Sequence, residues 1–123
     1  MTTPVISTLD PTVSWTDPTQ NTDGTPITPG ELSGYLVGLR DVNAAGSVAG
    51  TYPNTAAVQG GAATSSLLSA LGFLSHMVRG GTYAVAAESE VGGAAVGAWS
   101  AELIFTYSPP ASVPMPPTGL HIV

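Results

Sequence analysis

The sequence predicts an all-β fold, an antiparallel β-sandwich of seven short strands, and three observations support this prediction. Apolar and polar residues alternate with a period of two in several runs, which places successive side chains on opposite faces of a strand. Many of the 15 glycines and 11 prolines fall between these runs, where they favour tight turns. Apolar residues make up 43% of the 123, enough to bury the single core that this length supports.

The first two expected strands are short. Val5 to Leu9 is a β-prone run that Asp10-Pro11 brings to an end. Thr12 to Thr16 then places Val13 and Trp15 on one face and hydroxyl side chains on the other, which is typical of a half-buried strand.

The third expected strand follows a long loop. Several breakers interrupt Asp17 to Gly30, so we expect an irregular connection there. From Ser33 to Asp41 the period of two returns and places Tyr35, Val37 and Leu39 on one face. This run is the clearest strand in the sequence.

A partner strand is expected directly afterwards. Asn43 to Gly46 is an expected turn, and Ser47 to Tyr52 is the expected partner strand, ended by Pro53. Further along, Thr82 to Ser89 alternates again, and Trp99 to Tyr107 is the expected last strand.

The segment from Thr64 to Val78 fits two structures. Four apolar side chains recur at helical spacing, namely Leu67, Leu71, Leu74 and Val78. Gly72 interrupts this spacing, and the first part equally fits a strand. We favour a strand over Thr64 to Leu68, followed by a helical turn or an ordered loop.

The end of the chain is expected to form an arm. Five prolines, at positions 109, 110, 114, 116 and 117, favour an extended spacer. Gly119 to Val123 is β-prone without a local partner, so we expect it to add to the sheet edge of a protein partner. The expected division is a sandwich over 1–107 and a Pro-rich arm over 108–123. The expected partner contacts are Pro116, Pro117, Leu120, Ile122 and Val123.

Several short motifs resemble the fibronectin type III family. They are Val13-Ser14-Trp15 for its second strand, Gly34-Tyr35-Leu36-Val37 for its third, Thr82-Tyr83-Ala84-Val85 for its sixth and Gly97-Ala98-Trp99-Ser100 for the start of its seventh. The resemblance implies an immunoglobulin-like Greek-key arrangement of seven strands. The chain departs from the family by an insertion, Gly72 to Gly81, and Pro116 to Val123 resembles the opening of such a domain although it lies at the end.

Four aromatic residues are expected inside. Alternation predicts a core formed by Trp15, Tyr35, Val37, Leu39, Tyr83, Val85 and Trp99. A sugar-stacking platform is the alternative use of these rings, and the alternation favours the core. Tyr52 and Tyr107 are better candidates for exposed contacts.

Charge and composition exclude several function classes. Arg40 and Arg79 are the only formal cations against eight carboxylates, and the net charge is −6. This deficit disfavours nucleic acid and anionic lipid as partners. The absence of cysteine excludes disulfides and thiolate chemistry, and no segment is long enough to span a bilayer.

Catalytic patterns are weak. His76 lies in an apolar stretch and His121 in the arm, and neither has a neighbouring acid and nucleophile. We expect His76 to pack partly buried and His121 to be a polar member of an edge strand.

Four carboxylates are candidate metal ligands because they are expected at one pole of the sandwich, namely Asp17, Asp23, Glu88 and Glu90. No Asp-x-Asp-x-Asp-Gly loop is present, so solvated surface charges are the favoured interpretation. We expect no cofactor and no metal.

These observations favour a non-catalytic structural or adhesion module. The expected setting is a phage virion, as a capsid decoration, spike or tail protein that binds a capsid protein or a neighbouring subunit, or another copy of itself through the arm. The amino terminus, Met1 to Thr8, has no cationic stretch followed by an apolar run, so we do not expect it to be a secretory signal. The alternative is an accessory spacer or carbohydrate-binding domain of a secreted bacterial enzyme or adhesin, with a surface glycan as partner.

Overall fold

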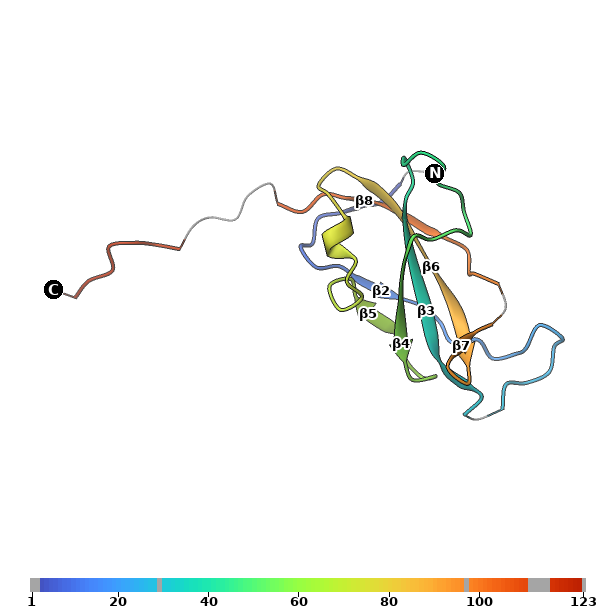
Figure 1. Cartoon of the computed structure of the whole chain (residues 1–123). Helices are drawn as coiled ribbons and strands as arrows, with labels where there is room; N and C mark the ends of the chain where they lie inside the picture. The colour runs from blue at the N-terminus through green and yellow to red at the C-terminus, as the bar shows by residue number, and fades with distance from the viewer. Residues whose placement is uncertain (1–2, 29, 97, 111–115, 123) are drawn as a thin grey trace.

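The computed structural model describes residues 3–28, 30–96, 98–110 and 116–122. The described chain is all-β apart from one 3-10 turn, η1 (Leu74–His76). Its strands form two sheets that lie on either side of a buried interior, an arrangement consistent with a β-sandwich (Figure 1).

The larger sheet holds most of the strands. Its order is β1 (Val5–Ile6), β8 (Leu103–Tyr107), β6 (Thr82–Val91), β3 (Leu32–Asp41) and β4 (Asn54–Gln59), with β7 (Ala94–Ala95) paired to β6. The smaller sheet pairs β2 (Thr12–Ser14) with β5 (Ser65–Leu67). The expected run Ser33 to Asp41 is therefore confirmed as a strand, β3, in register with both β4 and β6.

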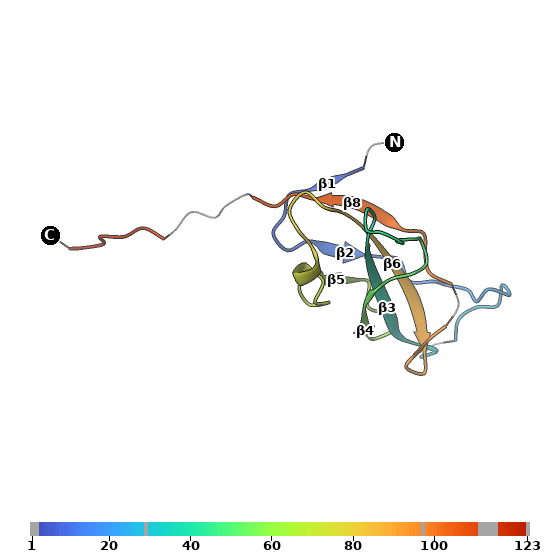
Figure 2. The same cartoon turned by 45° about the horizontal axis from the view of Figure 1, so that its top comes forward.

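The expectation of purely antiparallel pairing is wrong for the first strand. β1 runs parallel to β8, with Val5 opposite Thr106 and Ile6 opposite Tyr107 (Figure 2). The chain then crosses to the other sheet, where β2 pairs antiparallel with β5. The large sheet is therefore mixed, and β1 forms one of its edges.

The buried cluster lies between the sheets, where odd-numbered residues of β3 and β6 point inward. It comprises Val37, Leu39, Leu68, Leu71, Phe73, Met77, Tyr83, Val85, Phe105 and Tyr107. Tyr35 is also buried, at 2% exposure, and Trp15 packs half-buried against the cluster. The Trp15 indole N–H donates to the carbonyl of Ala63 at 2.9 Å, and its ring centroid lies 5.3 Å from that of Tyr35.

The expected partner strand over Ser47 to Tyr52 is wrong. The strand that pairs with β3 is β4, which begins after Pro53. Gly46 and Gly50 adopt positive φ angles of 76° and 90°, and these turns prevent an extended run. Proline thus precedes the strand, where its missing N–H costs no ladder hydrogen bond.

The segment after Ala63 follows the favoured interpretation. β5 is a strand and η1 is a short helical turn, so both parts of that prediction are confirmed. Phe73 and Met77 flank η1 and fill the interior, at 1% and 7% exposure. Gly72 makes this packing possible because its φ of 75° turns the chain back toward the sheets.

The last strand is shorter than expected. It begins at Leu103 rather than Trp99, because the Ser100 hydroxyl takes a place in the ladder. Ala87 N–H donates to Ser100 Oγ at 3.0 Å, and Ser100 N–H donates to the Ala87 carbonyl at 2.8 Å. The alternation that would turn Trp99 inward therefore does not apply, and Trp99 lies outside the buried cluster.

A tyrosine holds the loop before β6. The Tyr83 ring is 1% exposed, and its hydroxyl accepts a hydrogen bond from the backbone N–H of Val78 at 2.7 Å. Gly81 lies against this ring, and a Cβ at that position would come within 2.5 Å of the hydroxyl oxygen. The loop thus depends on a glycine and a tyrosine that are two residues apart.

We expect Tyr83→Phe to lower the free energy of unfolding by about 1–3 kcal/mol, because the Val78 N–H loses its partner inside the fold. Urea unfolding measures this change. Val78→Ala is the matched control, since that side chain is 66% exposed and the substitution keeps the N–H; we expect a change within about 0.5 kcal/mol. Equal stability of Tyr83→Phe and the wild type would contradict this role of the hydroxyl.

Candidate functional site

The outer face of the large sheet is covered as well. Gly38 lies opposite Ala86, and Arg40 lies opposite Ala84, on the face away from the buried cluster. Ala84 and Ala86 are nonetheless buried. A Cβ at Gly38 would come within 2.6 Å of the Tyr52 ring, so the ring packs directly on this strand. Small residues on the outer face thus leave room for a second layer.

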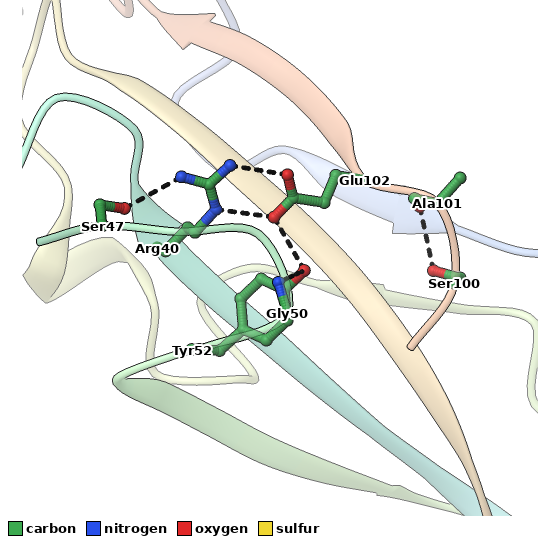
Figure 3. A network of polar contacts seen from close by, with 7 residues as sticks. All are labelled: Arg40, Ser47, Gly50, Tyr52, Ser100, Ala101 and Glu102. Carbon is green, nitrogen blue, oxygen red and sulfur yellow. Dashed lines mark hydrogen bonds and ion pairs between the residues drawn. The ribbon is translucent and has the colours of Figure 1, made fainter. Parts of the chain in front are cut away.

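A polar network forms that second layer (Figure 3). Arg40 Nε and Nη2 donate to the two carboxylate oxygens of Glu102 at 2.7 Å each, and the two side chains are 9% and 12% exposed. Arg40 Nη1 donates to Ser47 Oγ at 3.0 Å, and the Tyr52 hydroxyl donates to Glu102 Oε2 at 2.8 Å. The Trp99 ring centroid lies 4.6 Å from that of Tyr52. We call these five residues the outer-face network.

The network keeps its charges paired. Hydrogen bonds from the Arg40 guanidinium hold the pKa of Glu102 below its ordinary value, although burial acts in the opposite direction. Burial, and then the hydrogen bond to Glu102, raise the pKa of Tyr52. A bidentate pair of this kind orients both side chains. The network therefore attaches the loop before β4 and the segment before β8 to the centre of the sheet.

The candidate metal ligands do not converge. Asp17 accepts a hydrogen bond from the Tyr35 hydroxyl at 2.5 Å, and burial and this neighbour raise the pKa of Tyr35. Asp23 accepts from the Thr25 hydroxyl at 2.6 Å and the Thr25 N–H at 3.0 Å, within its own turn. Glu88 and Glu90 lie on β6, where Glu90 is buried opposite Gly34. Within the described ranges, no three His, Asp or Glu side chains are grouped as a metal site would require.

Two expectations for single side chains are wrong. His76 is exposed rather than partly buried, because Phe73 and Met77 take the inward positions around η1. Tyr107 is buried rather than exposed, and its hydroxyl donates to the Leu9 carbonyl at 2.7 Å. His121 has its Nδ1 2.7 Å from the Gly119 carbonyl. Residues 116–122 form no strand in the single chain, so the place of His121 in an edge strand, which requires a partner, stays a prediction.

An apolar groove opens at one side of the molecule, between β2 and the edge formed by β1 and β8. Its volume is about 340 Å³. It is lined by Pro4, Ile6, Thr8, Asp10, Pro11, Thr12, Val13, Leu68, Val85, Leu103 and Phe105. We call this hollow the lateral groove. Leu103 is 54% exposed in the groove, although it lies on the same face of β8 as the buried Phe105.

The arm presents its apolar residues to solvent. Leu120 and Ile122 are 98% and 99% exposed, and Pro116 and Pro117 are exposed too. Figure 1 shows this part of the chain lying apart from the two sheets. Val123 lies outside the described residues. Of the expected partner contacts, four are therefore described, and all four are accessible.

Sequence reasoning missed the outer-face network and the lateral groove. A signal for the network existed, because Arg40 follows Leu39 within the clearest strand and a buried arginine requires an acidic partner. The sequence did not indicate which of the eight carboxylates would be that partner. No sequence pattern indicated the groove, since its walls come from both sheets.

In the described part of the chain, no helix is long and apolar enough to cross a bilayer.

We expect Glu102→Gln to lower the free energy of unfolding at pH 7 by about 1–3 kcal/mol, because Arg40 is left without its charged partner. The pKa of Glu102 is lowered in the folded state, so the stabilisation is present above its ordinary value of 4.5 and is lost as pH falls through the lowered value. The difference between the two proteins should therefore shrink in acid.

Urea unfolding from pH 7 down to pH 3 measures this pH dependence. Glu31→Gln is the matched control, since it removes a carboxylate that makes none of the network's contacts. A Glu102→Gln difference that is constant over this range would contradict the linkage.

In comparisons with known proteins, no family model, no curated protein and no solved structure matches this chain. The function is therefore inferred from the arrangement of its own residues.

Proposed function

We propose that this chain is a non-catalytic structural or adhesion module that attaches to a protein partner through its C-terminal arm. The observation that carries this proposal is the exposure of Leu120 and Ile122, at 98% and 99%. Burial of such a side chain contributes about 1.5–3 kcal/mol, which the described fold does not use. A protein surface that covers both side chains would recover this stabilisation.

An extended arm suits addition to a sheet edge. The prolines that precede Thr118 favour an extended backbone and lose little further entropy on binding. From Thr118 onward every residue has a backbone N–H, so the segment is able to form ladder hydrogen bonds with a partner strand. Leu120 and Ile122 then lie on one face of the added strand.

We also propose a more specific fold, a fibronectin type III-like Greek-key sandwich, and two features support it. The pairing β8-β6-β3-β4 in one sheet and β2-β5 in the other resembles the central pairing of the two sheets of immunoglobulin-like domains, whereas β1 pairs with β8 rather than with the smaller sheet. The Tyr83 hydroxyl bonds to the backbone five residues upstream at the start of β6, as the tyrosine corner of such domains does. Domains of this architecture occur widely as binding and spacer modules.

The use of ionisable groups supports a non-catalytic role. Glu102, Asp17 and Asp23 each accept hydrogen bonds from side chains that hold local structure. His76 lies exposed on η1. Catalysis by acid and base requires such groups to converge on a reacting atom, and these groups are distributed over separate loops and strands.

The setting that we propose is a phage virion, where the module decorates a capsid or forms part of a spike or tail. A lysine-free chain with net charge −6 suits the exposed surface of a particle. The partner is then a capsid protein or a neighbouring subunit.

One observation favours the second candidate, a carbohydrate-binding accessory domain of a secreted enzyme or adhesin. Trp99 lies outside the core, half-exposed and against Tyr52 on the outer face. If this pair binds sugar, Trp99→Ala should abolish retention of the chain on a polysaccharide column, because aromatic rings stack on sugar faces. Equal elution of wild type and Trp99→Ala would contradict the glycan role.

The arm is tested by the double variant Leu120→Glu/Ile122→Glu. We expect its free energy of unfolding to stay within about 0.5 kcal/mol of wild type, because both side chains are exposed. We expect its incorporation into purified source particles, measured by mass spectrometry, to fall at least about tenfold, a loss of 1.4 kcal/mol or more.

Val78→Glu, at an exposed position outside the arm, is the control and should incorporate normally. Normal incorporation of the double variant would sink the proposed role of the arm, and absence of the wild-type chain from particles would sink the proposed setting.

A further inference from the structure

One edge of β2 is not paired with any other part of the chain that the structure describes. The Trp15 N–H donates to the Thr64 carbonyl at 2.8 Å, and the Leu68 N–H donates to the Pro11 carbonyl at 2.9 Å, so odd-numbered residues direct their peptide groups toward β5. By the alternation of an antiparallel ladder, Thr12 and Ser14 direct theirs away from β5. Among the described strands, β2 pairs with β5 alone. A row of backbone donors and acceptors is therefore open at this edge.

The lateral groove lies along the same edge. Thr12 and Val13 form one wall, Leu103 and Phe105 form the opposite wall, and no residue of β5 contributes. At about 340 Å³ the groove is more than twice the size of the ~150 Å³ cavity that holds a benzene molecule. It has room for two branched aliphatic side chains.

The arm matches this groove in spacing and chemistry. Leu120 and Ile122 are two residues apart, which places their side chains about 6.6 Å apart on one face of an extended strand. Leu103 and Phe105 have the same separation along β8. Neither arm residue is charged, so docking leaves no carboxylate or cation without a partner in the apolar part of the groove.

We propose that the arm of one copy of this chain docks in the lateral groove of a second copy, where residues 118–122 add a strand to the free edge of β2. This inference rests on the proposed role of the arm as a strand donor and names its acceptor. The contact joins two different surfaces, so it repeats from copy to copy and builds a chain or a closed ring.

The start of the arm favours a second copy over the same chain. Arg79 Nε donates to the Pro109 carbonyl at 3.0 Å, and Gly80 N–H donates to the Tyr107 carbonyl at 2.7 Å. These bonds lie at the Tyr107 end of β8, so the arm leaves the sheet at the end opposite to Leu103. To reach its own groove the arm would have to reverse, and the prolines at 109, 110, 114, 116 and 117 oppose reversal.

Engineered cysteines test the contact directly, because the chain has none of its own. The experiment mixes Leu103→Cys chains with Ile122→Cys chains and measures the disulfide-linked heterodimer after mild oxidation. Both positions are more than half exposed, so both variants should fold, which circular dichroism verifies. The control mixture replaces the groove variant by Val78→Cys. We expect a heterodimer yield at least about tenfold above this control.

The other outcomes are also decisive. A yield equal to the Val78→Cys control overturns the groove as the acceptor. If the double variant Leu103→Cys/Ile122→Cys gives mainly an internally crosslinked monomer, the arm docks in its own chain, and the second-copy proposal is wrong.

Sedimentation of the wild-type chain provides an independent readout. Its mass should rise with concentration above that of a monomer, and the Leu120→Glu/Ile122→Glu variant should remain monomeric; a monomeric wild type overturns the proposal. Loss of particle incorporation without any crosslink leaves the proposed function intact and removes this acceptor. A crosslink without arm-dependent incorporation supports the lateral groove as the acceptor and contradicts the proposed function of the arm on particles.

Discussion

The fold depends on the burial of both faces of β3. On the inner face, Tyr35, Val37 and Leu39 pack against the smaller sheet and the segment around η1. On the outer face, Gly38 leaves room for an aromatic ring and Arg40 pairs with Glu102. One strand thus organises an apolar core and a charged layer, and the two are separated only by the thickness of the sheet. The outer-face network fixes the position of the loop before β4 and the position at which β8 begins.

The period of two predicted the strands that carry bulky apolar side chains on one face and smaller or polar ones on the other. It failed where small residues occupy both faces. β3 and β6 were readable because bulky residues alternate there, as Tyr83 and Val85 do. The strand β4 was misplaced because Ala56 and Ala57 present nearly equal side chains to its two faces. Trp99 was assigned to the core because its strand was extended too far, and no sequence pattern shows where a serine hydroxyl enters a ladder.

The two candidate binding surfaces also differed in whether a sequence pattern indicated them. The arm was predictable from composition, since proline and apolar residues follow one another locally. The lateral groove was not, because Thr12, Leu68 and Leu103 meet only after the sheets have formed. The molecule has few charges, and most of the described ones lie in structural contacts. We therefore propose that the backbone edge of β2 and the aliphatic side chains of the arm are its means of binding. In that proposal, the open edge of β2 and the apolar, β-prone end of the arm complement each other.

Amide hydrogen exchange tests the central claim, that β3 is held from both sides while the edge of β2 stays open. In a dilute solution of the Leu120→Glu/Ile122→Glu variant, the amides of β3 and β6 should exchange with free energies near that of global unfolding. The amides of Thr12 and Ser14 should exchange many orders of magnitude faster. Protection of Thr12 and Ser14 equal to that of Val37 in this variant, or rapid exchange throughout β3, would contradict the account.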